Sequence, residues 1–499
     1  MDLDRLKRAV QRLTPTGGTT ERIVKSVIWV TGQNVIGRLI QLAMLLVLAR
    51  LIGPREIGLV GIALLALSAS RKFTNIGLNA AIVQRKESNV DGYLNTNWLL
   101  EIGRGALITV VLFASAPLIA SLFDTPRAEP LLQAIGFSPL ILGLRNPGVV
   151  YFQKNLEFHK QFVYRISGSI GSFIVAVGYA LVWPTAWAYV AGFLTADVIR
   201  LVVSYVIHDY RPRPQFDREV AGELINYGKW ITGSSILYFI YSEGDDAFVG
   251  WLLGPVALGW YQYAYRFSNA PATEISQVVS SVMFPAFSEY QDNPERLRSS
   301  FLKTVQLVSL VTFPMAIGIA VVTPTFVRGF LGSDWTGMIT AMQILTLFGL
   351  FRSLGKVFGA FWKAIGRPDY ITKLSVLRVA LLALLIYPAT STLGITGTAL
   401  LTTGIFVFPM MPIDLYIITR SVGTSYSALL SELVYPLAAS AIMGAIVWYV
   451  NLVLEIPPIA EFVVLVGLGA VIYGVVTLIF TQQFGWDIDK NVRELMSTL

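Results

Sequence analysis

Two groups of polar side chains lie inside long apolar stretches of this sequence, where charged residues usually have a function. Asn34, Arg38 and Gln41 follow one another at intervals of four and three residues, so on a helix they form one stripe. The second group is acidic and consists of Glu243, Asp245 and Asp246. A guanidinium binds phosphate or carboxylate through two hydrogen bonds and keeps its charge, whereas crowded carboxylates can hold Na⁺ or H⁺. The first group therefore predicts an anionic substrate, and the second predicts a coupling ion.

These two groups occupy related positions because the sequence repeats itself. Residues 29–58 realign on 230–259 without a gap. The matched residues are Trp29/Trp230, Thr31/Thr232, Gly32/Gly233, Leu51/Leu252, Gly53/Gly254, Pro54/Pro255 and Gly58/Gly259. The same offset places Ser235 and Ser242 opposite Asn34 and Gln41, so a second polar stripe continues into the acidic cluster. An internal duplication is typical of secondary transporters, which bind substrate between two related halves.

Further cations inside the apolar stretches add to the predicted anion site. These are Arg71, Arg145, Arg266 and Arg352, with Glu274 as an additional acidic candidate. Lys72 and Lys356 are expected to extend to lipid headgroups. The pairs Glu101/Arg104 and Asp197/Arg200 are spaced by three residues and predict local ion pairs, while the roles of Arg378 and Asp414 stay open.

Two alternatives remain for the central residues. Arg38 either binds an anionic substrate or forms a structural ion pair with Asp245 or Asp246 that holds the halves together. Asp245 and Asp246 are adjacent and project about 100° apart on a helix, so at most one can point squarely into a cavity. The spacing from Ser242 does not decide between them.

The composition indicates a polytopic membrane protein with helices only. Hydrophobic residues make up 54% of the 499 residues and charged residues 14%, with mean hydropathy +0.62. Since a span needs about 20 residues, fourteen spans leave no room for a soluble catalytic domain, and we expect no enzyme and no cofactor. The absence of cysteine and the presence of only two histidines, His159 and His208, argue against a metal centre.

The distribution of Lys and Arg predicts the topology. The fourteen spans are placed at 27–50, 57–82, 98–122, 129–152, 163–183, 186–207, 229–252, 257–285, 302–330, 337–362, 371–389, 394–419, 428–450 and 458–481. Basic residues gather in every second loop, which predicts that both termini are cytoplasmic. Six spans separate the repeats, so the halves should share one orientation and be related by an axis along the membrane normal.

The predicted organisation has six parts. A cytoplasmic amphipathic segment (1–26) precedes an N-terminal six-helix bundle (27–207), a cytoplasmic linker (208–228) and a C-terminal six-helix bundle (229–419). Two additional helices (428–481) and a cytoplasmic tail (482–499) follow. The linker is interpreted as a solvated hinge without ligand contacts.

Three stretches carry a resemblance to a known family. The sequences LARLIGPREIGLVGIA, FTNIGLNAAIVQRKE and GWLLGPVALGWYQYAYRFSNAP resemble the polysaccharide transporters of the multidrug/oligosaccharidyl-lipid/polysaccharide exporter superfamily, in particular the O-antigen, teichuronic-acid and exopolysaccharide flippases of prokaryotes. The resemblance implies a cell-membrane protein of surface-polysaccharide or lipopolysaccharide biosynthesis. It would move a polyprenyl-(pyro)phosphate-linked oligosaccharide across the bilayer by alternating access without ATP. The sequence agrees with transport that does not use ATP, because it has no GxxxxGK[ST] phosphate loop.

Partners and competing functions follow from the same features. Glycan-assembly proteins are possible partners, and no nucleic acid is expected. Tyr238, Tyr241, Trp260 and Tyr263 either stack on sugars or pack between helices. A multidrug or cation extruder of the same superfamily would be expected to have an acidic, aromatic cavity, which the surplus of arginine disfavours. A glycan polymerase or ligase would be expected to have a long catalytic loop outside the cell, and a scaffold would leave the intramembrane charges unexplained.

Overall fold

The computed structural model describes residues 19–75 and 90–484 of the chain. Every regular element in these residues is a helix. The chain forms two compact units, Met1–Val256 (unit 1) and Ala257–Leu499 (unit 2), and each is described by itself. The predicted boundaries of the six parts, including the division at 208–228, stay a prediction.

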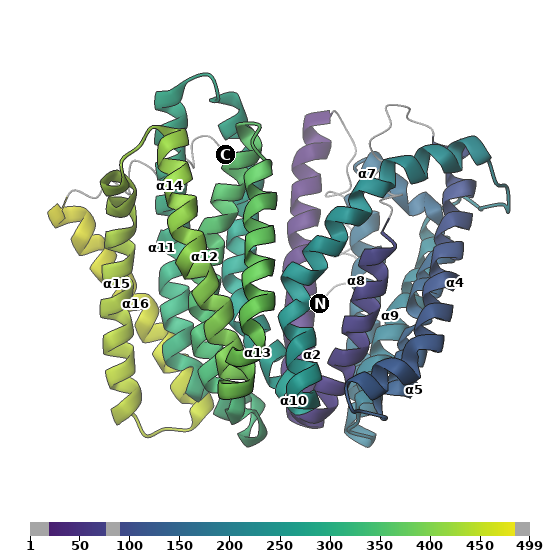
Figure 1. Ribbon diagram of the computed structural model, residues 1–499, viewed down its shortest axis with the longest axis horizontal. Helices are drawn as coiled ribbons and strands as arrows, with labels where there is room; N and C mark the ends of the chain where they lie inside the picture. Colours follow the sequence, from purple (N-terminus) through teal and green to yellow (C-terminus); the bar gives the residue numbers. More distant parts are fainter. Residues whose placement is uncertain (1–18, 76–89, 485–499) are drawn as a thin grey trace, which may run out of the picture. The chain divides into compact units, whose positions relative to one another are not determined.

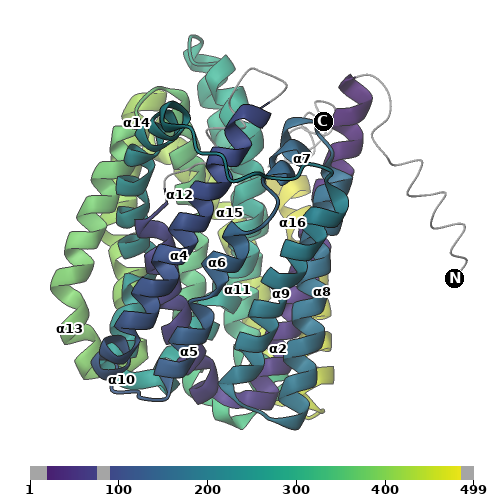
Figure 2. The same cartoon turned by 90° about the vertical axis from the view of Figure 1, so that its right-hand side faces the viewer.

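Unit 1 is built from long helices that run between two ends (Figure 1). Its elements are α2 (Thr19–Phe73), α4 (Asp91–Leu122), α5 (Ala128–Ile135), α6 (Ser138–Gly143), η1 (Pro147–Val149), α7 (Val150–Lys154), α8 (Phe158–Val182), α9 (Ala186–Ile207) and the first part of α10 (Arg218–Glu289). α8 packs along both α9 and α2, and Figure 2 shows α8 and α9 side by side. The end at which α7 lies is called the basic end, because Lys154 and Lys160 follow there, and α5 lies at the opposite end.

Unit 2 contains the rest of α10 and the remaining helices. These are α11 (Pro294–Phe326), η2 (Val327–Leu331), η3 (Ser333–Met338), α12 (Ile339–Ala364), α13 (Asp369–Ile405), η4 (Phe406–Met410), α14 (Met411–Val422), α15 (Tyr426–Val453) and α16 (Pro458–Phe484). Its largest described core gathers Phe287, Phe301, Phe358 and Phe361 between α10, α11 and α12. α15 packs against α11 and α16, so the two last helices cover one side of this unit.

The helices confirm the predicted number of spans. In the described residues, nine helices are long and apolar enough to cross a membrane. Gly53, Gly254 and Gly394 have φ values of 71°, 80° and 60° and divide α2, α10 and α13 into two segments each. The segments from α5 to α7 count as one crossing, and the second segment of α13 continues through η4 into α14 as another, so the described helices provide fourteen crossings.

The sequence repeat is also visible in the backbone. Gly53 (φ 71°, ψ 173°) and its counterpart Gly254 (φ 80°, ψ −175°) adopt nearly the same conformation, which glycine reaches without the steric cost of a Cβ. A proline follows each of them. Beyond the first turn, Gly58 lies so close to Pro255 that a Cβ would overlap the Pro255 carbonyl oxygen. The duplicated Gly-Pro turns therefore reverse the chain and also bring α2 against α10.

The fourth crossing is interrupted rather than continuous. Leu144, Arg145 and Asn146 separate α6 from η1, and η1 begins at Pro147, which lacks the N–H that a continuous helix would need. The side chain of Asn146 instead accepts a hydrogen bond from the N–H of Gly148 at 2.9 Å. The second crossing ends at Phe73, earlier than predicted, and residues 76–89 lie outside the described part.

The segment 208–217 is largely exposed and is also anchored to α4 by hydrogen bonds, while its predicted role as a hinge stays a prediction. Its backbone N–H groups at Arg213 and Asp217 donate to Asn95 Oδ1 and Thr96 Oγ1 of α4, at 2.8 and 3.0 Å. Tyr210 Oη donates to the same Asn95 oxygen at 2.9 Å. These side chains of α4 replace water as partners for the extended backbone.

Candidate functional site

A buried chain of hydrogen bonds connects three helices of unit 1. Arg71 Nη2 donates to Ser138 Oγ at 2.6 Å, and Ser138 Oγ donates to Asp197 Oδ2. The second carboxylate oxygen of Asp197 accepts from Arg200 Nη1 at 3.2 Å. The Asp197 side chain is only 2% exposed, so α2, α6 and α9 enclose this carboxylate. A hydroxyl can accept one hydrogen bond while it donates another, which allows Ser138 to transmit the charge interaction.

Arginine is in excess around this network. The charges of Arg104 and Arg200 act on Arg71, and those of Arg145 and Arg200 act on Arg165. Five arginines thus face two carboxylates, Asp197 and Glu101, of which Glu101 pairs with Arg104 at 2.8 Å. The predicted local ion pairs Glu101/Arg104 and Asp197/Arg200 are confirmed. This surplus of arginine agrees with the prediction of a site for an anion, which stays a prediction.

Sequence reasoning selected only part of this network. The sequence pattern indicates Arg71 and Arg145 as candidates, but not Ser138 or Arg165, and it predicts only a local pair between Asp197 and Arg200. The available signal was the position of Asp197 within the apolar stretch 186–207, where a carboxylate needs partners. The identity of those partners depends on which helix faces meet, and the sequence pattern of one helix does not contain that information.

The predicted stripe of α2 is present on its surface. Arg38 Nη1 donates to Gln41 Oε1 at 3.1 Å, so these two side chains share one face. Asn34, Arg38 and Gln41 are all exposed in unit 1, while the neighbouring Gly37 faces Ile166 of α8. The role of the stripe in binding an anion stays a prediction.

The acidic cluster lies on α10, beside α2. Glu243 Oε1 accepts from Ser68 Oγ at 2.8 Å, and Asp245 is 4% exposed whereas Asp246 is half-buried. Their burial differs, but their role in coupling stays a prediction. The side chain of the fourth candidate, Glu274, lies outside the described part of the structure.

Unit 2 has its own cations, and aromatic rings surround them. Arg352 Nη1 donates to Tyr265 Oη at 3.1 Å. The guanidinium of Arg378, which is 5% exposed, lies 5.1 Å from the ring centre of Phe348 and 5.4 Å from that of Phe406. Arg378 is therefore held by cation–π contacts.

The remaining candidates of unit 2 differ in their surroundings. Arg266 is half-buried, and the charge of Arg352 acts on Lys356. Tyr263 is buried against Trp335, with ring centres 4.5 Å apart, so it packs between helices. Of the two functions left open for Tyr263, helix packing is the one that this contact supports.

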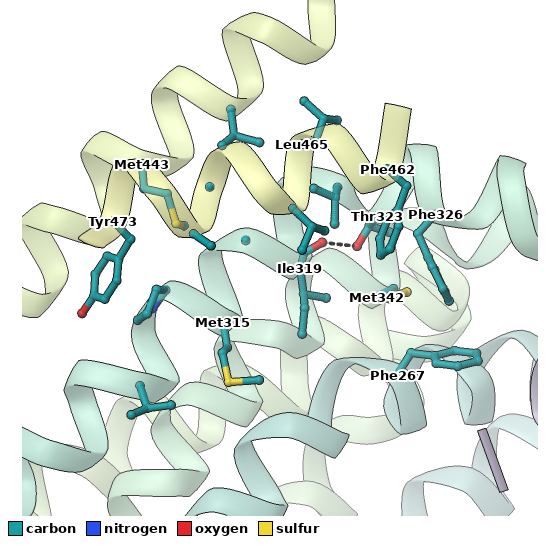
Figure 3. A pocket seen from close by; sticks show the side chains of 18 of the residues that line it. Phe267, Met315, Ile319, Thr323, Phe326, Met342, Met443, Phe462, Leu465 and Tyr473 are labelled. Atoms are coloured by element: carbon teal, nitrogen blue, oxygen red, sulfur yellow. Dashed lines mark hydrogen bonds between the residues drawn. The ribbon is translucent and has the colours of Figure 1, made fainter. Parts of the chain in front are cut away.

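An apolar groove of about 700 Å³ lies between α11 and the last two helices (Figure 3). Met315, Ile319, Met443 and Phe462 are among the side chains that line it. Tyr473, one of its polar lining residues, donates its hydroxyl to the carbonyl of Leu310 at 2.7 Å. The aromatic ring of Tyr473 lines the groove. Such a lining suits a hydrocarbon chain. The sequence predicts that these two helices lie outside the repeat, but it does not predict the groove.

The sequence of this chain is similar to those of known proteins of polysaccharide biosynthesis. The family model described as polysaccharide biosynthesis protein matches residues 47–340. The lipopolysaccharide biosynthesis protein WzxC of Escherichia coli (strain K12) is 28% identical over 364 residues, which cover 72% of this chain and 74% of that protein. The teichuronic acid biosynthesis protein TuaB of Bacillus subtilis (strain 168) is 24% identical over 383 residues, covering 76% and 79% of the two chains.

Solved structures show the same fold. The lipid II flippase MurJ in an inward closed conformation matches with a TM-score of 0.74 at 15% identity, covering 92% of this chain and 99% of that one. An inward-facing multidrug resistance transporter of the MATE family, in the MOP superfamily, matches with a TM-score of 0.60 at 16% identity, covering 80% and 99%. At these identities the likeness concerns the fold alone.

Proposed function

Because the chain belongs to the family of polysaccharide biosynthesis proteins, we propose that it is a flippase for a lipid-linked oligosaccharide. It moves a polyprenyl-(pyro)phosphate-linked oligosaccharide from the inner to the outer leaflet of a prokaryotic cell membrane by alternating access. Relatives are named for biosynthesis of lipopolysaccharide and teichuronic acid and for transport of succinoglycan, and one is named a probable glycan flippase. These names support a glycan substrate over a drug.

The excess of arginine in unit 1 carries this proposal. Sugars and phosphate cannot cross hydrocarbon unaided, because each would lose its hydrogen bonds to water. The Arg71–Ser138–Asp197–Arg200 network places guanidinium groups inside a unit whose helices cross the membrane. These groups can replace water around a phosphate with charge-assisted hydrogen bonds. The cationic substrate of a drug extruder would be repelled by the arginines at the same site.

The apolar groove of unit 2 supports the part of this proposal that concerns the lipid tail of the substrate. A polyprenyl chain is a run of methyl-branched apolar isoprene units, and the side chains of Met315, Met443 and Phe462 offer it van der Waals contacts. The protein then has to move only the headgroup, since the tail stays in an apolar environment throughout. No bond is made or broken in this process.

We assign the driving force to a gradient of Na⁺ or H⁺, with Glu243, Asp245 and Asp246 as the ion-coupling residues. Both termini are assigned to the cytoplasm, from the distribution of Lys and Arg. Glycan-assembly proteins that supply the lipid-linked oligosaccharide are the expected partners.

The decisive experiment is a flipping assay in proteoliposomes. Purified protein should expose a fluorescently labelled polyprenyl-diphosphate oligosaccharide to a membrane-impermeant quencher, and it should leave ethidium, an organic cation, untransported. Arg38→Ala should abolish this flipping at normal protein yield, whereas Arg55→Ala, which also removes an exposed arginine of α2, should retain it. Export of ethidium without glycan flipping would instead support an extruder, and normal flipping by Arg38→Ala would remove Arg38 from the site.

A further inference from the structure

The first segment of α10, residues 218–253, is joined to α2 at the basic end. Thr232 Oγ1 donates to the carbonyl oxygen of Asn75 at 2.8 Å, and Asn75 Nδ2 donates to Ser235 Oγ at 3.5 Å. One turn further along α10, the rings of Phe73 and Phe239 meet edge to face with 5.5 Å between their centres. Hydrogen bonds and an aromatic pair therefore hold the end of α2 against two turns of α10.

The same two helices also meet midway along the segment and at its opposite end. Ser68 Oγ donates to Glu243 Oε1 at 2.8 Å. Where α10 turns, Gly58 lies so close to the carbonyl oxygen of Pro255 that no side chain would fit between them. Residues 232–254 of α10 cover about 33 Å at 1.5 Å per residue, which is close to the thickness of the hydrocarbon layer. These contacts are called the seam, and they join α2 to α10 over the depth of a membrane.

The chain before this segment is held to unit 1 as well. The backbone of the linker is hydrogen-bonded to α4, and Val220 packs against a small core that contains Val90 and Leu94. The two compact units accordingly divide only after Val256. The sequence repeat instead predicts a division before the seventh crossing, at 208–228. The contacts and the repeat thus assign the first segment of α10 to different parts of the molecule.

A glycine marks the point where the contacts of α10 with unit 1 end. Gly254 has a φ of 80°, which glycine adopts without the strain that a Cβ would cause. A Cβ built at Gly254 would meet no heavy atom of the described chain within 4 Å, so only the backbone conformation requires glycine there. Hinges are residues at the ends of elements that take up a change in φ and ψ. Gly254 has the backbone freedom and the position that a hinge requires.

We propose that the first segment of α10 moves as part of unit 1 during transport and that the chain bends at Gly254. The seam then stays closed at both of its ends throughout the cycle, while an ion at Glu243 can still alter the packing between them. Such a boundary separates the first seven crossings of the described chain from the next seven, although each sequence repeat contains six. The inference goes beyond the proposed substrate, since it concerns which helices move together and not what they bind.

Cross-linking of the seam tests whether it has to open. The chain contains no cysteine, so a pair of cysteines can be introduced without background. Phe73→Cys/Phe239→Cys, joined by a short bifunctional methanethiosulfonate, should flip the labelled glycan as fast as the untreated double variant. The two single variants, treated with the same reagent, control for modification of one thiol. Flipping that stops when the pair is joined and returns on reduction would show that the seam opens, and the proposal would be wrong.

The duplicated turn supplies a matched pair of variants for the hinge. Gly53 and Gly254 have similar positive φ values, and a Cβ would be unobstructed at both. Alanine disfavours this conformation to a similar degree in the two turns. Because the proposal keeps Gly53 in one conformation, its strain cancels between states, and Gly53→Ala should flip normally per folded molecule. Gly254→Ala should flip about tenfold more slowly, since each cycle has to return to the strained conformation. Equal rates in the two variants would contradict the hinge.

Distances between spin labels test the inference independently of the proposed function. The pair Val110→Cys/Ile240→Cys reports on α4 and α10 within unit 1, and the pair Ile240→Cys/Val376→Cys reports on α10 and α13; all three positions are exposed. In nanodiscs at pH 5.5 and 8.0, with and without Na⁺, the first distance should stay constant while the second changes. A first distance that changes, or a second that stays fixed in every condition, would overturn the proposal. A protein that shows the expected distances but does not flip the glycan would lose the proposed function and keep the hinge.

Discussion

At the scale of single residues, His208 connects the anchored linker to the end of α9. Its Nδ1 accepts a hydrogen bond from the N–H of Tyr210 at 3.0 Å, and its ring stacks on Tyr151 with 5.7 Å between ring centres. Burial lowers the pKa of His208 below its usual value, and the positive charge of Lys160 lowers it further. Glu157, Asp209 and Asp91 oppose this shift without cancelling it. The neutral ring is thus part of the anchored structure, because a protonated Nδ1 cannot accept the hydrogen bond.

This geometry predicts that the anchor weakens in acid. A folded-state pKa below the unfolded value means that the unfolded segment binds the proton more tightly, so stability falls as pH drops below about 6.5. The protection of the amides of residues 208–217 from hydrogen exchange, expressed relative to the intrinsic exchange rate at each pH, should therefore fall between pH 7.5 and 5.5. His208→Asn keeps an acceptor but does not titrate, so in this variant the same amides should lose most of the added pH dependence. An equal loss of protection in the parent and in His208→Asn would assign the effect to another group.

At the scale of helices, the sequence predicts the crossings better than it predicts their contacts. Apolar runs of span length and a repeated Gly-Pro turn are local properties, so the crossings and the matching conformations of Gly53 and Gly254 follow from the sequence. The interruption at Pro147 is less evident, because a proline inside a membrane helix is tolerated where neighbours satisfy the backbone. The Arg71–Ser138–Asp197 network joins residues about 60 positions apart. It depends on how α2, α6 and α9 pack, which the composition of each helix leaves open.

The close approach of α2 and α10 gives a prediction at this scale. Gly58→Ala places a methyl group against the carbonyl of Pro255, and backbone cannot move aside as a flexible side chain can. We expect a loss of about 1–3 kcal/mol, the usual cost of overpacking, measured as a lower unfolding temperature in detergent. Gly32→Ala in the same helix is the control. No atom lies within 4 Å of its added methyl, and alanine favours a helix, so stability should stay the same or rise. Unchanged stability of Gly58→Ala would show that the two helices can separate there without cost.

At the scale of the whole molecule, transport requires that a change at the coupling ion alters the binding of the lipid-linked glycan. The acidic cluster is connected to α2, since Glu243 accepts from Ser68 of this helix, which also carries Arg38 and Arg71, and Asp245 is buried two residues after Glu243. A proton or Na⁺ on these carboxylates would change how α10 is held against α2. In the proposed mechanism, ion binding and anion binding would then be linked through one helix, and by linkage each would change the affinity for the other.

The double variant Asp245→Asn/Asp246→Asn tests this linkage in the intact chain. The amides keep the size of the carboxylates but neither titrate nor balance a cation, so glycan flipping should persist and lose its response to an imposed Na⁺ or pH gradient. Ser68→Ala is the matched control, because it removes only the hydrogen bond to Glu243 and should keep the gradient response. The flipping rates of the labelled glycan with and without the gradient show whether each variant still couples flipping to the ion. A double variant that responds to the gradient as the parent does would give these two carboxylates a structural role and place the coupling ion at another acid, with Glu274 and the buried Asp414 as the next residues to vary.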